Sequence, residues 1–202
     1  MTSRSDNVVA LFAHPRPSRL PLACEQAALP TPFERVNGVI AYWDALRAGQ
    51  TTPSRSAIDP SALGQALSNI FLAEVVAPGQ ARIRLSGQVL SDLLGMEPRG
   101  MPLSVLFAMS ARDEVAMALR QVMTGARVRL PIRAETGFGK PGMDGEIALM
   151  PLLDTTGRPS RVLGVVETIG QIGRAPRRFT LRVSPRPMAG VPPFSVIEGR
   201  RT

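Results

Sequence analysis

The sequence has few of the side chains on which metal sites and nucleophilic catalysis depend. Its 202 residues include a single cysteine, Cys24, and a single histidine, His14. One cysteine excludes an internal disulfide framework and a cysteine-cluster metal site, and one histidine excludes a multi-histidine site within the chain. Most enzyme chemistry is therefore not available to this sequence.

Long apolar runs are lacking as well. No uninterrupted apolar stretch approaches the roughly 20 residues that a membrane-spanning helix needs. The short run Val8–Ala13 is followed by His-Pro-Arg-Pro instead of a signal-peptide cleavage site. We therefore expect a cytoplasmic protein with no transmembrane segment. Hydrophobic residues still make up 44% of the sequence, which excludes a fully disordered chain.

The net charge of +8 is concentrated near the C-terminal end of the sequence. Residues 34–169 carry 14 basic and 13 acidic side chains, whereas residues 170–202 carry seven arginines and one acid. Residues 1–33 contain five prolines, and prolines are frequent again after residue 170. We predict a flexible Pro-rich N-terminal arm at 1–33, a folded domain at 34–169 and a basic Pro/Arg-rich tail at 170–202.

The apolar periodicity of the middle part predicts an α+β domain. From Phe33 to Ala48 apolar residues recur every three or four positions, which is typical of an amphipathic helix, and Gly49 ends it. Asp59 and Pro60 are suited to cap and begin a second, short helix. Further helices are predicted at 89–94, 103–107 and 110–124, and strands at 71–76, 81–86, 127–134, 146–153 and 161–169. This order predicts a five-stranded antiparallel sheet with the helices packed on one face, and residues 179–183 favour one more short strand.

Several short motifs follow one another in the order found in one known family. They are Tyr42-Trp43 with Arg47 and Gly49, Pro53-Ser-Arg55 with Ile58-Asp59-Pro60, Arg84-Leu85-Ser-Gly87, Leu94-Gly95 with Gly100, and Met150-Pro151-Leu152 with Gly157 and Leu163-Gly164. Over residues 36–169 the sequence resembles a PAS domain, in particular the single-domain PAS-like proteins of bacteria. The resemblance implies a sensory or protein-interaction module, although a fold by itself does not identify what is bound.

The resemblance also implies a small cavity enclosed by the sheet and its helices. The side chains expected to line this cavity are Ile83, Leu85, Val115, Leu119, Met123, Leu130, Ile132 and Met150. No cofactor is expected, because His14 and Cys24 precede the predicted domain and supply neither a haem ligand nor an attachment site for a chromophore. A small apolar ligand, held without a covalent bond, is compatible with such a cavity.

The first predicted helix carries the candidate surface for a homodimer or a protein partner. Val39, Tyr42, Trp43 and Leu46 lie on it, and aromatic side chains dominate many protein–protein contacts. The alternative is that these side chains cover the open sheet face of their own chain. The sequence leaves both interpretations open.

Arginines account for the remaining candidate contacts. Those at 82, 84, 127, 129 and 133 alternate with apolar residues, so we expect a solvated face neutralised by paired acids. The loop at 137–142 lacks the Gly-Lys-Ser/Thr ending of a phosphate loop, which argues against nucleotide hydrolysis. Arg174, Arg177 and Arg178 are candidates for contact with a polyanion.

The sequence therefore predicts a non-enzymatic regulatory module that acts by association with a protein. The acids Asp44, Asp59, Glu74 and Glu167 have no histidine or cysteine partner, so capping and surface roles are expected for them. The alternative is a nucleic-acid-associated protein that uses its arginine-rich C-terminal tail.

Overall fold

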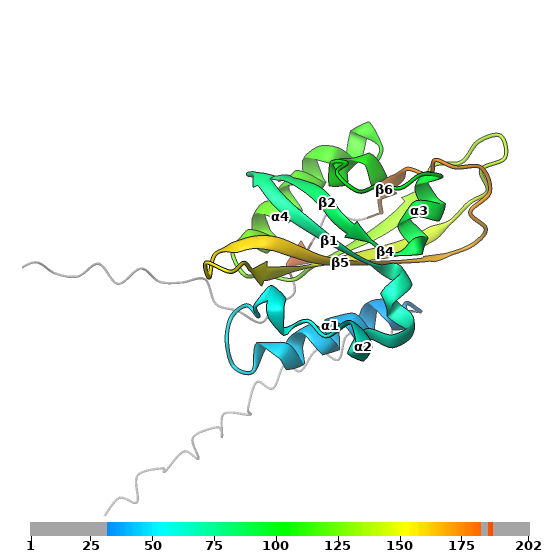
Figure 1. Cartoon of the computed structure of the whole chain (residues 1–202). Helices are drawn as coiled ribbons and strands as arrows, with labels where there is room; N and C mark the ends of the chain where they lie inside the picture. Colours follow the sequence, from blue (N-terminus) through cyan, green and yellow to red (C-terminus); the bar gives the residue numbers. More distant parts are fainter. Residues whose placement is uncertain (1–31, 183–185, 188–202) are drawn as a thin grey trace, which may run out of the picture. The chain divides into compact units, whose positions relative to one another are not determined.

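The strands of the structure pair side by side into one antiparallel sheet (Figure 1). The computed structural model describes residues 32–182 and 186–187. The strands are β1 (Ile70–Ala77), β2 (Gln80–Ser86), β3 (Val128–Ala134), β4 (Asp144–Leu153), β5 (Pro159–Ile169), β6 (Phe179–Leu181) and β7 (Arg186–Pro187). Their order is β2-β1-β5-β4-β3-β6, and β7 also pairs with β3. The two longest strands, β4 and β5, therefore lie in the middle.

The helices form two groups along the chain, one before β1 and one between β2 and β3. The α-helices are α1 (Glu34–Arg47), α2 (Pro60–Leu63), α3 (Gln88–Leu94) and α4 (Arg112–Met123). Short 3₁₀ helices are η1 (Arg55–Ala57), η2 (Gly64–Asn69), η3 (Leu103–Leu106) and η4 (Met109–Ala111). Among the described residues, no helix has the length and apolar character that crossing a bilayer requires.

The central strands are buried on both faces, which separates the core into two clusters. Ile147 and Leu149 of β4 point into an inner core that α3, η3 and α4 cover. Ala148 and Met150, which alternate with them, point into an outer core beneath α1. Strands that are buried on both faces read as continuous apolar runs instead of alternating ones, as residues 147–153 do.

This arrangement corrects one part of the fold prediction. The α+β class and the antiparallel sheet are confirmed, but the helices cover both faces of the sheet: α1 and α2 lie on one side, and α3 and α4 on the other (Figure 1). Beyond the predicted strands, the sheet also has the short strand β7. The predicted strand at 179–183 is present as β6.

The folded body extends past residue 169, where the sequence placed the start of a tail. Phe179 is fully buried in the inner core, and β6 pairs with β3. The Arg177 side chain is also fully buried. Residues 170–182 therefore belong to the domain. The predicted N-terminal arm lies outside the described residues, except for its last two positions.

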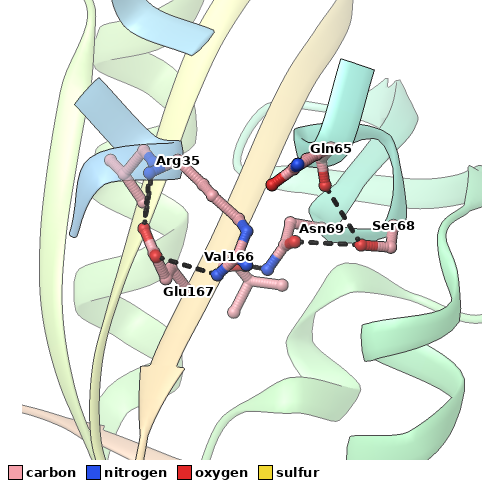
Figure 2. Close-up of polar contacts among 7 residues, drawn as sticks. Arg35, Gln65, Ser68, Asn69, Val166 and Glu167 are labelled. Carbon is pink, nitrogen blue, oxygen red and sulfur yellow. Dashed lines mark hydrogen bonds and ion pairs between the residues drawn. The ribbon is translucent and has the colours of Figure 1, made fainter. Parts of the chain in front are cut away.

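The N-terminus of helix α1 is capped by a residue that is distant in the sequence. Phe33 precedes the helix and provides no side-chain cap. Instead, the Glu167 carboxylate on β5 accepts hydrogen bonds from the backbone N–H groups of Arg35 (2.9 Å) and Val36 (3.1 Å). Figure 2 shows Glu167 beside Arg35, whose guanidinium also donates to this carboxylate at 3.3 Å. Because a carboxylate at a helix N-terminus satisfies free N–H groups and favours the helix dipole, Glu167 fixes α1 on the sheet.

A second polar contact holds the segment that precedes β1. The Asn69 side-chain amide donates to the carbonyl of Val166 at 2.7 Å, and the Ser68 hydroxyl donates to the Asn69 amide oxygen at 3.1 Å (Figure 2). Asn69 thus occupies the position next to β5 just before Ile70 begins to pair with that strand. The two contacts lie at neighbouring residues of β5 and tie both α1 and η2 to it.

Gly164 gives a direct test of how tightly the inner core is packed. A Cβ atom at this position would lie 2.0 Å from the Phe71 ring, which covers it from the neighbouring strand. We expect Gly164→Ala to lower the free energy of unfolding by about 1–3 kcal/mol or more, because the ring has to move. The matched control is Gly38→Ala in α1, where nothing lies within 4 Å of the added atom. That variant gains about 0.5–1 kcal/mol from helix propensity. Urea denaturation of both variants measures the difference, and equal stabilities would contradict this packing.

The cap on α1 gives a second test. We expect Glu167→Ala to destabilise the protein by about 1–3 kcal/mol, because it leaves two backbone N–H groups and a guanidinium without their acceptor. The exposed Glu135→Ala serves as the control and is expected to change stability by less than about 0.5 kcal/mol. Chemical denaturation provides the measurement. If the two variants lose the same stability, the cap does not hold α1.

Candidate functional site

Five of the predicted cavity residues lie together in the inner core. Ile83, Leu130 and Ile132 come from the sheet, and Val115 and Leu119 from α4. Each is at most 2% exposed. They belong to the packed core, and none of them lines any of the surface hollows described below.

Of the other three predicted cavity residues, Met123 packs at the edge of the inner core, whereas Leu85 and Met150 lie on the outer face of the sheet. Ile83 pairs with Ala73 and Leu85 pairs with Leu72, so Arg84 has no opposite residue on β1. This bulge shifts the alternation by one residue and turns Leu85 to the outer face, where it is 49% exposed. Met150 lies in the outer core for the reason given above, and Met123 lines a surface hollow beside Val75. The prediction that these residues share one cavity with Ile83 is wrong for Leu85 and Met150.

A groove lies on the outer face of β1 and β2, next to the part of the sheet that α1 covers. Two hollows, of about 730 and 760 Å³, share the lining residues Arg55, Leu72, Leu85 and Ser86. We call the two together the outer-face groove. One end is mostly apolar, and it is lined by Ile58, Pro60, Leu63, Leu67, Ile70 and Leu163. The other end is charged, and it is lined by Arg84, Glu97, Arg99, Asp154 and Arg161.

The ion pairs of the charged end leave two arginines without a partner among the described residues. Glu74 binds Arg84 at 2.6 Å and Arg161 at 3.1 Å. The guanidinium groups of Arg55 and Arg99 have no hydrogen bond or ion pair with any residue of the described part of the chain. The charged end therefore presents free donors that carry positive charge.

Asp154, at the same end, is fully engaged within its own turn. Its carboxylate accepts hydrogen bonds from the backbone N–H and hydroxyl of Thr156 (2.8 and 2.7 Å), from the Arg158 N–H (3.1 Å) and from the Ser160 hydroxyl (2.7 Å). These bonds, those of Thr156 and Ser160 above all, hold the pKa of Asp154 well below its usual range. The carboxylate shapes the turn and has no role as a proton donor near neutral pH.

The predicted partner surface on α1 faces inward. Val39 is 1% exposed, and Trp43 is fully buried with its indole N–H donating to the Pro151 carbonyl at 2.9 Å. The Tyr42 hydroxyl accepts a hydrogen bond from the Asp59 N–H at 2.7 Å, and Leu46 is half-buried. The structure therefore favours the second interpretation, in which these side chains cover the sheet of their own chain.

The three arginines proposed for polyanion contact do not form one surface. Arg174 and Arg178 are exposed, but Arg177 is fully buried. Its guanidinium donates to the carbonyls of Ile172, Glu135 (3.2 Å) and Pro141 (2.6 Å), and burial lowers its pKa. Arg177 is therefore a structural side chain and is not accessible to a polyanion.

Arg177 supports the most exposed large hydrophobic side chain that the structure describes. Arg177 binds the carbonyls of Glu135 and Pro141, which lie at the base of the loop between β3 and β4. This loop extends beyond the end of the sheet (Figure 1). At the tip, Gly137 and Lys140 exchange backbone hydrogen bonds of 3.1 and 2.9 Å, and Gly139 has a φ of 69°. Phe138 occupies the resulting two-residue turn and is 94% exposed. We call residues 135–142 the Phe138 hairpin.

The carboxylates that were weighed for catalysis have structural contacts. Asp44 pairs with Arg127, Glu74 with two arginines, and Glu167 caps α1, as described above. Asp59 is the N-cap of α2, as predicted, and hydrogen bonds from Ser61 lower its pKa. Arg129 pairs with Glu146, and Arg133 lies 3.6 Å from Asp144, so paired acids do neutralise part of the predicted arginine face. Within the described ranges, no group of three or more acids, histidines or cysteines is placed to hold a metal ion.

Comparison with known families identifies the fold. The model of a PAS domain family matches residues 34–167. The match covers about two thirds of the chain, so the chain belongs to the PAS domain family. PAS domains are sensory and regulatory modules, and this assignment confirms the resemblance found in the sequence motifs. No curated protein matched the sequence.

Solved structures of PAS and LOV domains resemble the chain only distantly. The light-state LOV domain of the blue-light photoreceptor Aureochrome1 is 15% identical, has a TM-score of 0.39, and the match covers 55% of this chain and 88% of that one. The PAS domain of an HTR-like protein from Haloarcula marismortui is 20% identical, with a TM-score of 0.39 and coverage of 54% and 90%. An RNA-binding light-oxygen-voltage receptor is 19% identical, with a TM-score of 0.41 and coverage of 78% and 36%. No ligand or partner is inferred from similarities at this level.

The Asp154 turn predicts a pH dependence with a definite sign. Because the pKa of Asp154 in the folded state lies below its ordinary value of 3.8, the carboxylate stabilises the fold fully above that pH. This contribution is lost as the pH falls through the folded-state pKa. We therefore expect Asp154→Asn to lower the urea midpoint at pH 7, and we expect the difference from the parent protein to shrink steadily below pH 3.8. A difference that is the same at pH 7 and pH 3 would contradict this assignment.

Proposed function

We propose that this PAS domain is a non-enzymatic regulatory module that acts by association with a protein, and that the Phe138 hairpin makes the contact. The observation that carries the proposal is the 94% exposure of Phe138 at the tip of a braced turn. Large aromatic side chains with this exposure are costly to hydrate, and aromatic residues are enriched among the anchors of protein interfaces.

The hairpin is held rigidly, which suits an anchor. The Arg174 N–H donates to the Gly139 carbonyl at 2.7 Å, and the Lys140 ammonium donates to the Pro176 carbonyl at 2.8 Å. A Cβ atom at Gly173 would lie 2.5 Å from that same Gly139 carbonyl, so the 173–176 segment packs directly against the hairpin. Because the loop is ordered before it binds, association costs less conformational entropy.

The charge around Phe138 points to an acidic partner. Lys140 lies within the hairpin, and Arg174 and Arg178 lie in the segment whose backbone is hydrogen-bonded to it. The Arg174 and Arg178 side chains have no ion pair with any described residue. Glu135 is the one acid of residues 135–142. An apolar pocket with an acidic rim on the partner would complement this surface and speed association.

The same charges oppose a second copy of this chain as the partner. Two apolar hollows on the described part of the chain are large enough to be considered for Phe138: the outer-face groove, which contains Arg55 and Arg84, and the hollow beside Val75, which contains Arg120. Placing a cationic hairpin against these arginines would be repulsive. The buried position of Arg177 likewise weakens the nucleic-acid alternative, since one of its three proposed contacts is not accessible.

The absence of catalysis remains part of the proposal and rests on how the acids are used. Glu146 and Glu167, the buried carboxylates of the described chain, are each bound to an arginine, and Glu167 also holds two backbone N–H groups. Asp154 is occupied by four hydrogen bonds within its own turn. None of these carboxylates is left free to act on a substrate.

Site-specific photo-crosslinking tests the hairpin. A photoreactive phenylalanine analogue is placed at position 138 of the full chain in cells of the native host, and at Met109, which is 75% exposed, as the control position. We expect an acidic protein to be captured from position 138 only. The captured protein is then purified and bound to the parent chain and to its variants in vitro. We expect Phe138→Ala to weaken this binding about tenfold or more, and Arg174→Glu with Arg178→Glu to weaken it similarly.

Controls separate this contact from folding and from membranes. Met109→Ala is the matched control and is expected to leave binding unchanged. The melting temperature of Phe138→Ala should equal that of the parent, because the Phe138 side chain is 94% exposed and buries little surface. If nothing is captured above the control position, or if Phe138→Ala binds the purified protein as the parent does, the proposal is wrong. It is also wrong if the hairpin instead binds phosphatidylglycerol vesicles in a Phe138-dependent way and binds no protein.

A further inference from the structure

The outer-face groove separates apolar and charged residues along its length, not across its width. The end between η2 and β2 is lined by leucines and isoleucines, and two of them are widely exposed: Leu67 at 45% and Leu85 at 49%. The opposite end is lined by four arginines and two acids. Arg55, Leu72 and Leu85 line both ends and join them.

From this division we propose that the groove binds an amphiphilic anion, a molecule with a hydrocarbon chain and a carboxylate or phosphate head. The chain lies over Leu67 and Leu85, and the head binds at Arg55 and Arg99. This site is independent of the Phe138 hairpin, and it differs from the interior cavity expected from the sequence, since five of those cavity residues are packed in the inner core.

The head-group end has free donors in the right place. Arg55 and Arg99 have no partner among the described residues, whereas Arg84 and Arg161 are already bound to Glu74. The two acids that line this end are satisfied: Asp154 by its own turn, and Glu97 by the Ser86 hydroxyl (3.2 Å) and the Arg99 N–H (3.1 Å). Arginine presents a planar set of donors that matches carboxylates and phosphates, so an anionic head group would supply the acceptors that the Arg55 and Arg99 guanidinium groups lack.

The apolar end has the size and chemistry for a single hydrocarbon chain. Its volume of about 730 Å³ falls within the range of small-molecule sites. Its charged side chain is Arg55, which lies at the junction with the other end. An amphipathic helix would need an apolar strip running the whole length of the groove, which the arginine-rich end does not provide.

Binding of defined amphiphiles to the full chain tests this site. The probes are dodecanoate and dodecyl phosphate, with dodecanol as the uncharged match and acetate and inorganic phosphate as heads without a chain. The two long anions are used below their critical micelle concentrations, and dodecanol is used below its solubility in water. Dissociation constants come from calorimetry, and NMR amide shifts locate the bound ligand. We expect both long anions to bind at least tenfold more tightly than dodecanol, and we expect the short anions not to bind measurably. Shortening the chain should weaken binding by about two- to fourfold per methylene group.

Two pairs of variants locate the site. Arg55→Ala with Arg99→Ala is expected to weaken dodecanoate about tenfold or more and to leave dodecanol unchanged. Leu67→Ser with Leu85→Ser is expected to weaken both. The matched controls are Arg120→Ala and Met117→Ser on α4, which replace an exposed arginine and a methionine that is 49% exposed; neither should change binding.

Three binding results would overturn the proposal, and the first two need only the parent chain. They are failure of the parent chain to bind either long anion, equal affinity for dodecanoate and dodecanol, and affinities that the groove variants do not change. Amide shifts confined to inner-core residues such as Leu119 and Leu130 would likewise place the ligand elsewhere.

Discussion

The fold depends on burying both faces of its two central strands. β4 and β5 are apolar on both sides, so the sheet is stable only when a second layer covers the outer face. Helix α1 provides that layer, and three contacts hold it there: the Glu167 cap at its beginning, and in its C-terminal half the hydrogen bond from Trp43 to the Pro151 carbonyl and the Asp44–Arg127 ion pair. Arg47 and Arg127 lie 5.3 and 5.8 Å from the centre of the Trp43 ring, which adds cation–π attraction.

The surfaces proposed for function follow from where this covering stops. α1 packs on β4 and β5, so the outer face of β1 and β2 remains open as a groove. The bulge at Arg84 adds an exposed leucine to that groove. The second surface is the Phe138 hairpin. Arg177 binds three carbonyls, and these bonds hold the 170–178 segment against the hairpin. Both surfaces thus lie beside a structural feature that fixes their conformation: the bulge at Arg84 for the groove, and the buried Arg177 for the hairpin.

Local patterns in the sequence predicted the elements well, but not their three-dimensional partners. The spacing of Val36, Ile40 and Trp43 identified α1, and Asp59 identified the start of α2, because both signals are local. The bulge that reverses Leu85 leaves no mark in an otherwise regular alternation of arginines and apolar residues. The cap on α1 joins residues 131 positions apart, so no spacing rule reveals it. The continuous apolar run at 147–153 was the available sign that helices cover both faces of the sheet.

The cationic C-terminal segment shows a similar limit. Its arginines are alike in sequence, yet Arg177 is buried while Arg174 and Arg178 are exposed. Charge counting cannot make this distinction, because the burial of Arg177 depends on one carbonyl of its own segment, that of Ile172, and on two carbonyls of the Phe138 hairpin. Phe138 is apolar, so its residue type alone would assign it to a core. Its exposure follows from its position in the two-residue turn of the hairpin, which is visible only in the structure.

The central claim, that α1 is an integral cover of the sheet, is tested most directly by the fluorescence of Trp43, the single tryptophan of the chain. In a urea titration with acrylamide quenching, we expect blue-shifted emission that acrylamide does not reach in the native state. The fluorescence transition should coincide with the loss of sheet circular dichroism, because one cooperative unit unfolds. Emission that is quenched in the native protein, or that changes at lower urea than the dichroism, would show that α1 leaves the sheet independently and would contradict this account.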